Sequence, residues 1–294
     1  MWDLIIKSYT SYAAYLEKAI FSPIESGYYS FYSLIIISLL VWGLEIALPW
    51  RKNQKILRKQ FGLDVFYMFF NYFAFNLLIY AALSSTTQDL FSRLMSSVGL
   101  PKEFVFDFSG ISLVTQLIVF FLLYDFFQWL VHNMLHRVPI LWRFHKVHHS
   151  VEEMGFAAHL RYHFMENIIY RLALYISLSY LLHFKLEYTF WLYAATTLIG
   201  HLNHANVVLD YGPLKYIFNN PKMHIWHHSK VLPESHPKGM NFGLTLSLWD
   251  YLFKTNYIPH DGRDIPLGFD KIEEYPQGFI RHQFEAFKKE KSEE

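Results

Sequence analysis

Three long apolar runs constrain this chain more than any other feature, because each is about as long as a membrane-spanning helix. The runs cover residues 31–50, 61–83 and 111–131. A helix needs about 20 predominantly apolar residues to cross the hydrocarbon core of a bilayer. A buried helix of a soluble protein seldom stays apolar on every face for that length. The sequence therefore predicts three membrane spans.

Basic residues indicate how these spans are oriented. The loop between the first two runs contains Arg51, Lys52, Lys55, Arg58 and Lys59. Because cytoplasmic loops of membrane proteins are enriched in Lys and Arg, this loop is expected in the cytoplasm. By alternation, the second span leads out, the third leads back, and the chain from residue 132 onward reaches the cytoplasmic side. A bacterial inner membrane or an endoplasmic reticulum would fit.

The remaining segments complete the expected architecture. Residues 1–30 lack the continuous apolar core of a signal peptide and predict an interfacial segment. Residues 31–131 hold the transmembrane helices, and residues 132–294 form a histidine-rich catalytic region. Within that region, two shorter apolar stretches at 168–200 predict a membrane hairpin, whether or not it crosses completely. We expect an all-α integral membrane bundle of about four to five membrane helices with a cytoplasmic helical cap.

Composition limits the chemistry that this chain can perform. It has no Cys, which excludes disulfides, thiolate nucleophiles, Cys-ligated zinc and iron–sulfur clusters. Its 26 Lys and Arg nearly balance 25 Asp and Glu, so charge gives no reason to expect a nucleic acid partner. The 16 His must carry any metal chemistry, and thirteen of them lie between positions 132 and 228.

Eight of these histidines form three tight groups. Residues three or four apart share a helix face, so each group can direct two or three imidazoles toward one point. A single zinc ion takes about four protein ligands, so eight imidazoles predict a dinuclear metal site. The groups are His132 and His136; His145, His148 and His149; and His224, His227 and His228.

Three further residues are candidate members of this site. His201 and His204 are three residues apart and follow the hairpin directly, and His204 is the stronger candidate of the two. Asp125 lies seven residues before His132 on the same helix face, and we expect it to accept an imidazole N–H from a metal ligand.

The sequence does not assign two further residues to a single role. His163 either joins the metal site or belongs to a structural knot of hydrogen bonds and salt bridges with His159, Arg161 and Glu166. Glu45 lies near the end of the first span and has no partner that the sequence identifies.

Nitrogen ligands alone do not identify the metal, because imidazole suits iron, copper, nickel and zinc. A redox pair at the cytoplasmic boundary of the membrane suits oxidation of an apolar chain by activated oxygen better than hydrolysis of a soluble substrate. The alternative is a membrane transporter or sensor for a divalent metal. Transport sites would lie along the spans, whereas these histidines follow the spans.

The motifs also resemble those of the fatty acid hydroxylase and sterol desaturase superfamily, which are membrane di-iron enzymes. HNMLHR, LWRFHKVHHS, LRYHFME, HANV, PKMHIWHHS, MNFG and LSLWDYLFKT occur in the family's order between residues 125 and 255. The resemblance implies two iron ions, replaceable by zinc on expression, with O2 as co-substrate. It implies hydroxylation or desaturation of a membrane lipid such as a fatty acyl chain, sterol or ether lipid. Electrons would come from an external reductase, ferredoxin or b-type cytochrome.

The resemblance assigns metal binding to the eight grouped histidines and places His204 near the metals. Two features depart from the family pattern. Lys254 stands where the family often has Gly, and the loop 230–239 is longer than usual. Because that loop follows the last histidine motif, we expect these departures to affect the choice of lipid more than the chemistry.

Overall fold

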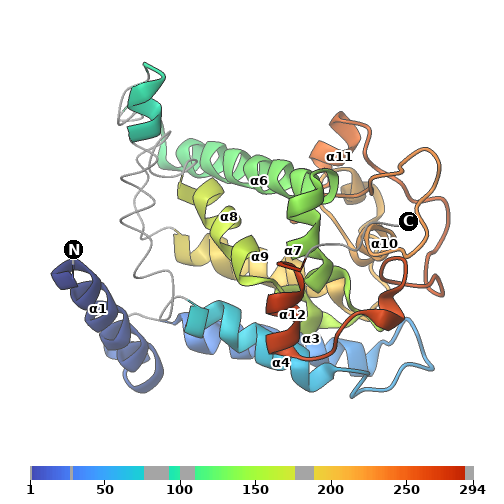
Figure 1. The fold of residues 1–294 in the computed structure, drawn as a ribbon, viewed down its shortest axis with the longest axis horizontal. Coiled ribbons are helices and arrows are strands. Elements are labelled where there is room, and N and C mark those ends of the chain that lie inside the picture. The colour runs from blue at the N-terminus through green and yellow to red at the C-terminus, as the bar shows by residue number, and fades with distance from the viewer. Residues whose placement is uncertain (1, 27–28, 76–92, 100–109, 176–188, 289–294) are drawn as a thin grey trace.

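The computed structural model describes residues 2–26, 29–75, 93–99, 110–175 and 189–288 (Figure 1). In these ranges the chain is all-α, and its extended pairing is limited to isolated bridges such as Phe218–Leu246. The helices and helical turns are α1 (Trp2–Phe21), α2 (Pro23–Ser26), α3 (Ser30–Ala47), α4 (Phe61–Phe69), η1 (Phe70–Ala74), α6 (Leu113–Arg137), α7 (Pro139–His149), η3 (Phe156–Leu160), α8 (Phe164–Tyr175), α9 (Thr189–His204), η6 (Gly212–Tyr216), α10 (Pro221–His227), α11 (Leu248–Leu252), η7 (Ile272–Glu274) and α12 (Phe279–Glu285).

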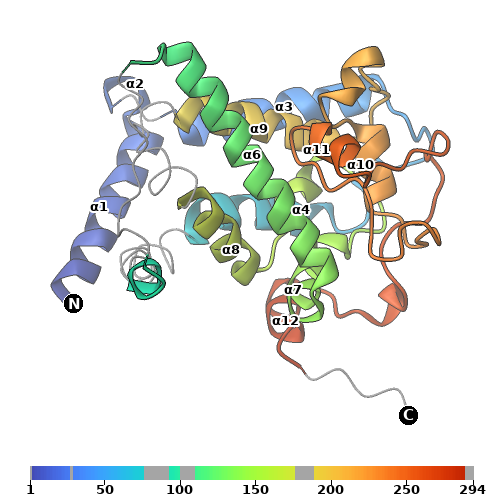
Figure 2. The same cartoon turned by 90° about the horizontal axis from the view of Figure 1, so that it is seen from above.

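The long helices deliver the histidine motifs to one end of the molecule. α3 packs on α9, and α6 packs on both α7 and α8. The C-terminal ends of α3, α6 and α9 all point toward the end where α10 and α11 lie (Figure 1). α1 lies at the opposite end in both views (Figure 2). Residues after each of these three helices therefore meet in one region, although they are far apart in sequence.

Two of the described helices, α3 and α6, are long and apolar enough to cross a membrane. Only 17% and 22% of their apolar windows are buried inside the protein, whereas a core helix of a soluble protein is mostly buried. Large side chains such as Leu40 on α3 and Val114 on α6 are exposed instead. Both helices coincide with the first and third spans that the sequence predicts.

The helix boundaries differ from the predicted runs for simple reasons. α3 ends at Ala47 rather than at residue 50, because Pro49 lacks the N–H that would continue the helix. α6 begins where the Ser112 side chain accepts a hydrogen bond from the Thr115 N–H, and it continues to Arg137. Its 25 residues span about 37 Å, against roughly 30 Å of hydrocarbon. The last turns of α6 therefore extend beyond the length that a bilayer core needs.

The other predicted segments are described only in part. The second run begins as α4 and continues through the π-helix η1, and its remainder falls in residues 76–92, outside the described residues. The hairpin is represented by α8 and α9, and its turn at 176–188 also lies outside them. Residues 1–30 form mainly α1 and α2. The polar C-terminal third consists of short helices joined by long irregular segments.

A buried ion network ties α4 to the segment after η3. Asp64 on α4 lies 2.6 Å from Arg58 Nη1 and 2.9 Å from Arg161 Nη1. All three side chains are buried, so the carboxylate is the counter-ion of two guanidinium groups that water does not reach. The network fixes the segment 156–161 against α4, next to the histidine-bearing helices.

We predict that Asp64→Asn lowers the free energy of unfolding by about 3–5 kcal/mol, because it leaves two buried guanidinium groups without a counter-charge. The matched control is Glu152→Gln, which removes an exposed ion pair with Lys59 and should cost less than about 1 kcal/mol. Denaturant titration in detergent micelles measures both. Equal losses for the two variants would contradict the prediction.

Candidate metal centre

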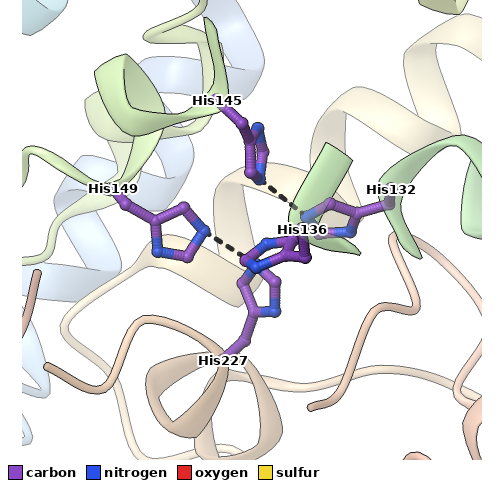
Figure 3. A group of neighbouring side chains, drawn as sticks. All are labelled: His132, His136, His145, His149 and His227. Atoms are coloured by element: carbon purple, nitrogen blue, oxygen red, sulfur yellow. Dashed lines mark hydrogen bonds between the residues drawn. The ribbon is translucent and has the colours of Figure 1, made fainter. Parts of the chain in front are cut away.

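Five histidines from three helices converge as the first group, which we call group A. α6 supplies two of them, α7 supplies two and α10 supplies one, and all five rings point toward a common centre (Figure 3). One nitrogen from each ring lies within 4.8 Å of a nitrogen of every other ring. Such a set can surround a single cation. Group A consists of His132, His136, His145, His149 and His227.

Four more histidines form a second set, group B, with the same closeness. α7, α9 and α10 each supply one, and the residue directly after α10 supplies the fourth. All four side chains are buried. Rings of the two groups are in contact, with the ring centres of His149 and His228 4.3 Å apart. Group B consists of His148, His204, His224 and His228.

The doublets His148-His149 and His227-His228 explain how two short helices serve two centres. Neighbouring residues on a helix point about 100° apart, because one turn takes 3.6 residues. On α7, His145 and His149 are four apart and both reach group A, while His148 reaches group B. On α10 the pattern is reversed: His227 reaches group A, while His224 and the next residue after the helix, His228, reach group B.

Hydrogen bonds on the outer side of the rings set which nitrogen faces inward. In group A, the Nδ1 atoms of His132 and His227 donate to the carbonyls of Phe242 and Met240, at 2.7 and 2.8 Å. In group B, His204 Nδ1 donates to the Gly200 carbonyl at 2.8 Å. A carbonyl only accepts, so Nδ1 carries the proton in each ring and Nε2 presents a lone pair.

A carboxylate performs the same task for His145. Glu166 on α8 is buried, and its Oε1 lies 2.9 Å from His145 Nδ1. With Nδ1 donating to this carboxylate, Nε2 of His145 carries a lone pair. That atom lies 3.1 Å from Nε2 of His132, which is also unprotonated. Two facing lone pairs repel each other, and a cation between them would turn the repulsion into attraction.

The nitrogen spacing matches that of metal ligands. Metal–imidazole bonds of about 2.0–2.1 Å place adjacent ligand nitrogens about 2.9–3.4 Å apart. In group A, Nε2 atoms of His149 and His227 are 3.1 Å apart, as are those of His132 and His145 (Figure 3). The corresponding contacts in group B measure 2.9–3.2 Å. His136 Nε2 is buried without a hydrogen-bond partner, which also suits a ligand.

Burial keeps these imidazoles neutral. It lowers the pKa of His145, His149 and His227 in group A well below the usual value, and proximity to other imidazoles lowers it further. The same causes act on His148 and His224 in group B. Since a metal binds only the unprotonated ring, both groups are ready to bind a cation at neutral pH.

Three predicted residues lie elsewhere. Asp125 contacts no imidazole: its Oδ2 accepts hydrogen bonds from Trp249 Nε1 at 2.9 Å and from the Leu246 N–H at 3.3 Å. Asp125 therefore does not accept an imidazole N–H as the sequence predicted. The face of α6 that carries it packs on the segment leading into α11 instead. His201 and His163 are not members of either group.

The bonds of these two histidines show what they do instead. His201 Nδ1 lies 2.8 Å from His159 Nδ1, and its Nε2 lies 3.1 Å from Ser38 Oγ on α3. His163 Nε2 donates to the Gln283 carbonyl, and its Nδ1 accepts from the Met165 N–H. Both nitrogens of His163 are thus used in joining α8 to α12.

Two carboxylates that organise the site have roles that the sequence did not reveal. Glu166 orients His145, although sequence suggested a link to Arg161, which pairs with Asp64 instead. Glu45 accepts the N–H groups of Phe156 and Asn206, both at 2.8 Å. It thereby links the start of η3 to the segment that follows α9. The available signal was an acid within an apolar helix, since such a residue needs a partner.

Comparison with known proteins agrees with this site. Residues 117–255, which include all nine histidines, match the fatty acid hydroxylase family. Ornithine lipid hydroxylase OlsE of Rhizobium tropici is 38% identical over 144 residues, 49% of this chain and 42% of that protein. Alkylglycerol monooxygenase of Homo sapiens is 34% identical over 143 residues, 46% of this chain and 29% of that protein.

A further relative, alkylglycerol monooxygenase of Xenopus tropicalis, is 30% identical over 147 residues, 47% of this chain and 30% of that protein. The chain thus spans less than half the length of these relatives. No solved structure matches it. The family match and these relatives confirm the resemblance that the histidine motifs indicate.

We predict that Glu166→Gln weakens metal binding at group A by about 10–100-fold, since a neutral amide polarises the His145 ring less than a carboxylate does. Cobalt(II) titration of the metal-free protein in detergent, followed by visible absorption, measures this affinity. Glu273→Gln, which removes an exposed pair with Lys230, is the control and should bind like wild type. Wild-type affinity in Glu166→Gln would show that the carboxylate does not act on the metal.

Proposed function

We propose, from the fatty acid hydroxylase family match of residues 117–255, that this chain is a membrane di-iron monooxygenase that hydroxylates a lipid. The observation that carries the proposal is the convergence of nine histidines in two adjoining groups at one end of two helices long and apolar enough to span a membrane. The two groups would each hold one iron ion.

The donor set supports this metal content. Each group offers only imidazole nitrogen, and nitrogen ligands suit iron while leaving zinc as a substitute during expression. Two iron ions bound there would supply the activation of O2. The histidines of group A and group B would hold the metals, Glu166 and the backbone carbonyls keep the lone pairs aimed inward, and burial of the rings keeps bulk water away.

The position of the groups supports a substrate that arrives from the bilayer. His132 and His136 lie in the last turns of α6, just past the length of helix that the hydrocarbon core needs. A lipid chain lying along the exposed apolar surface of α6 would bring its C–H bonds toward the metals. A water-soluble substrate would not need the centre to adjoin the spans.

Contacts of the basic loop 51–60 support a cytoplasmic location for the centre. Arg51 donates through its N–H to Asn206 Oδ1 at 2.8 Å and through Nη2 to the Met154 carbonyl at 2.9 Å. Asn206 follows α9, which carries His204, so the loop and the metal groups share one end of the protein. If this loop is cytoplasmic, as its charge favours, then so is the centre.

The overall reaction sets the co-substrate and the partner. Hydroxylation inserts one oxygen atom of O2 into a C–H bond and reduces the other to water, which consumes two electrons and two protons. We propose an external reductase, ferredoxin or b-type cytochrome as the electron donor. Hydroxylation is preferred over desaturation because the matched relatives are named as a hydroxylase and monooxygenases. A membrane lipid with an acyl or alkyl chain is the proposed substrate.

We expect cells expressing the chain to contain lipids 16 mass units heavier than those of control cells, as measured by mass spectrometry of lipid extracts. His148→Ala should abolish this product and leave about one iron per chain instead of two after anaerobic iron loading. His260→Ala, an exposed histidine outside both groups, should keep both properties.

Product formation and two irons in His148→Ala would overturn the proposal. Uptake of a divalent metal into proteoliposomes without lipid oxidation would favour the alternative of a transporter or sensor. That alternative predicts ligands along the spans, whereas the two groups lie together at one end.

A further inference from the structure

The segment MNFG at residues 240–243 covers group A, yet it contains no metal-binding side chain. Its Met240 and Phe242 carbonyls accept the Nδ1–H groups of His227 and His132. The segment thus holds two of the five group A rings through its backbone alone. A change in either peptide plane would turn a ring or free it to change tautomer.

Asp250 on α11 fixes the conformation of this segment. Its Oδ1 accepts the Phe242 N–H at 2.9 Å, and its Oδ2 accepts the Gly243 N–H at 2.8 Å. Oδ1 also accepts hydrogen bonds from Trp129 Nε1 on α6 and from Thr255 Oγ1. The buried carboxylate therefore connects the helix that carries His132 with the backbone that orients His132.

Asn241 fixes the same segment from its other side. Its backbone has φ +54°, in the left-handed region that few residues other than Gly and Asn adopt readily. Its Nδ2 donates to the Met223 and Tyr257 carbonyls, and its Oδ1 accepts the Tyr257 N–H. These bonds stabilise the turn that points the flanking carbonyls, Met240 and Phe242, toward group A.

Two glycines allow the close approach. A Cβ on Gly243 would collide with the Leu246 carbonyl and lie 2.9 Å from Asp250 Oδ2. Gly239 has φ +96°, and a Cβ there would lie 3.1 Å from His136 Nδ1, a third group A ring. The segment is therefore packed tightly on one group of ligands.

Group B has no equivalent support from this segment. Among the described residues, its outer hydrogen bond runs from His204 to the Gly200 carbonyl within α9, where the helix itself holds the acceptor. Nδ1 atoms of His148, His224 and His228 have no hydrogen-bond partner in this part of the chain. Loss of the MNFG conformation should thus affect one metal and spare the other.

We propose that Asp250 and Asn241 are positioning residues for group A, which act through the Phe242 and Met240 carbonyls to hold His132 and His227 in the metal-binding tautomer. This inference rests on the proposed two-metal function. It gives a role to the MNFG and LSLWDYLFKT motifs, neither of which contributes a metal ligand.

The test is cobalt(II) titration of the metal-free full chain in detergent, followed by visible absorption against a competing chelator. Asp250→Asn presents an amide N–H₂ to the Gly243 N–H, so that hydrogen bond is lost and the segment must shift. We expect wild type to bind two equivalents, and Asp250→Asn to bind one of them about 10–100-fold more weakly. Asn241→Gly keeps the left-handed backbone but removes the side-chain bonds, and it should weaken the same equivalent.

Reference variants identify which group is affected. The cobalt absorption bands that Asp250→Asn loses should be the same bands that His136→Ala, a change in group A, loses. They should differ from the bands lost by His148→Ala, a change in group B. Glu273→Gln is the control, because it removes only an exposed ion pair with Lys230, and it should bind both equivalents like wild type.

The outcomes separate this inference from the proposed function. Wild-type binding of both equivalents by Asp250→Asn and Asn241→Gly would overturn the inference, as would equal weakening of both equivalents, which indicates a general loss of fold. Wild type that binds fewer than two equivalents would instead overturn the two-metal proposal itself.

Discussion

The constraint on which this structure depends is that unprotonated imidazole nitrogens must face one another without water between them. Facing lone pairs repel, and burial adds a desolvation cost for any proton that would relieve the repulsion. A divalent cation resolves both costs at once, and nine rings in two groups give it two places to bind. The backbone carbonyls of Phe242 and Met240 and the carboxylate of Glu166 keep the lone pairs aimed inward.

The helices satisfy this constraint by ending at the same place. α6 extends past the length that a bilayer core needs, so His132 and His136 stand at its boundary. α7 and α10 are short and carry adjacent histidines, which lets each helix serve both metal groups. Two acids elsewhere hold this arrangement in place: the buried Asp64 binds the arginines beside η3, and the partly buried Glu45 binds the backbone at the start of η3 and just after α9.

Local patterns in the sequence predicted much of this. The i, i+3 and i+4 spacing in 145–149 and 224–228 identified histidines that the structure brings together, because residues at those distances share a helix face. The length of the apolar runs identified α3 and α6, because the thickness of the bilayer sets a minimum length for a spanning helix. Sequence could not divide the ligands between two groups, since that depends on how α7 and α10 rotate against α6. The sequence also predicted that Asp125, on the same helix as His132, would accept an imidazole N–H. In the structure the carboxylate that does so is Glu166, which reaches His145 from a different helix.

The most direct test of the account is X-ray absorption at the iron edge on the detergent-purified, anaerobically loaded chain. The account predicts two irons per chain, each surrounded mainly by imidazole nitrogen at about 2.1 Å, with the multiple-scattering pattern of histidine rings. Fewer than two irons, or a first shell dominated by oxygen without histidine scattering, would contradict it.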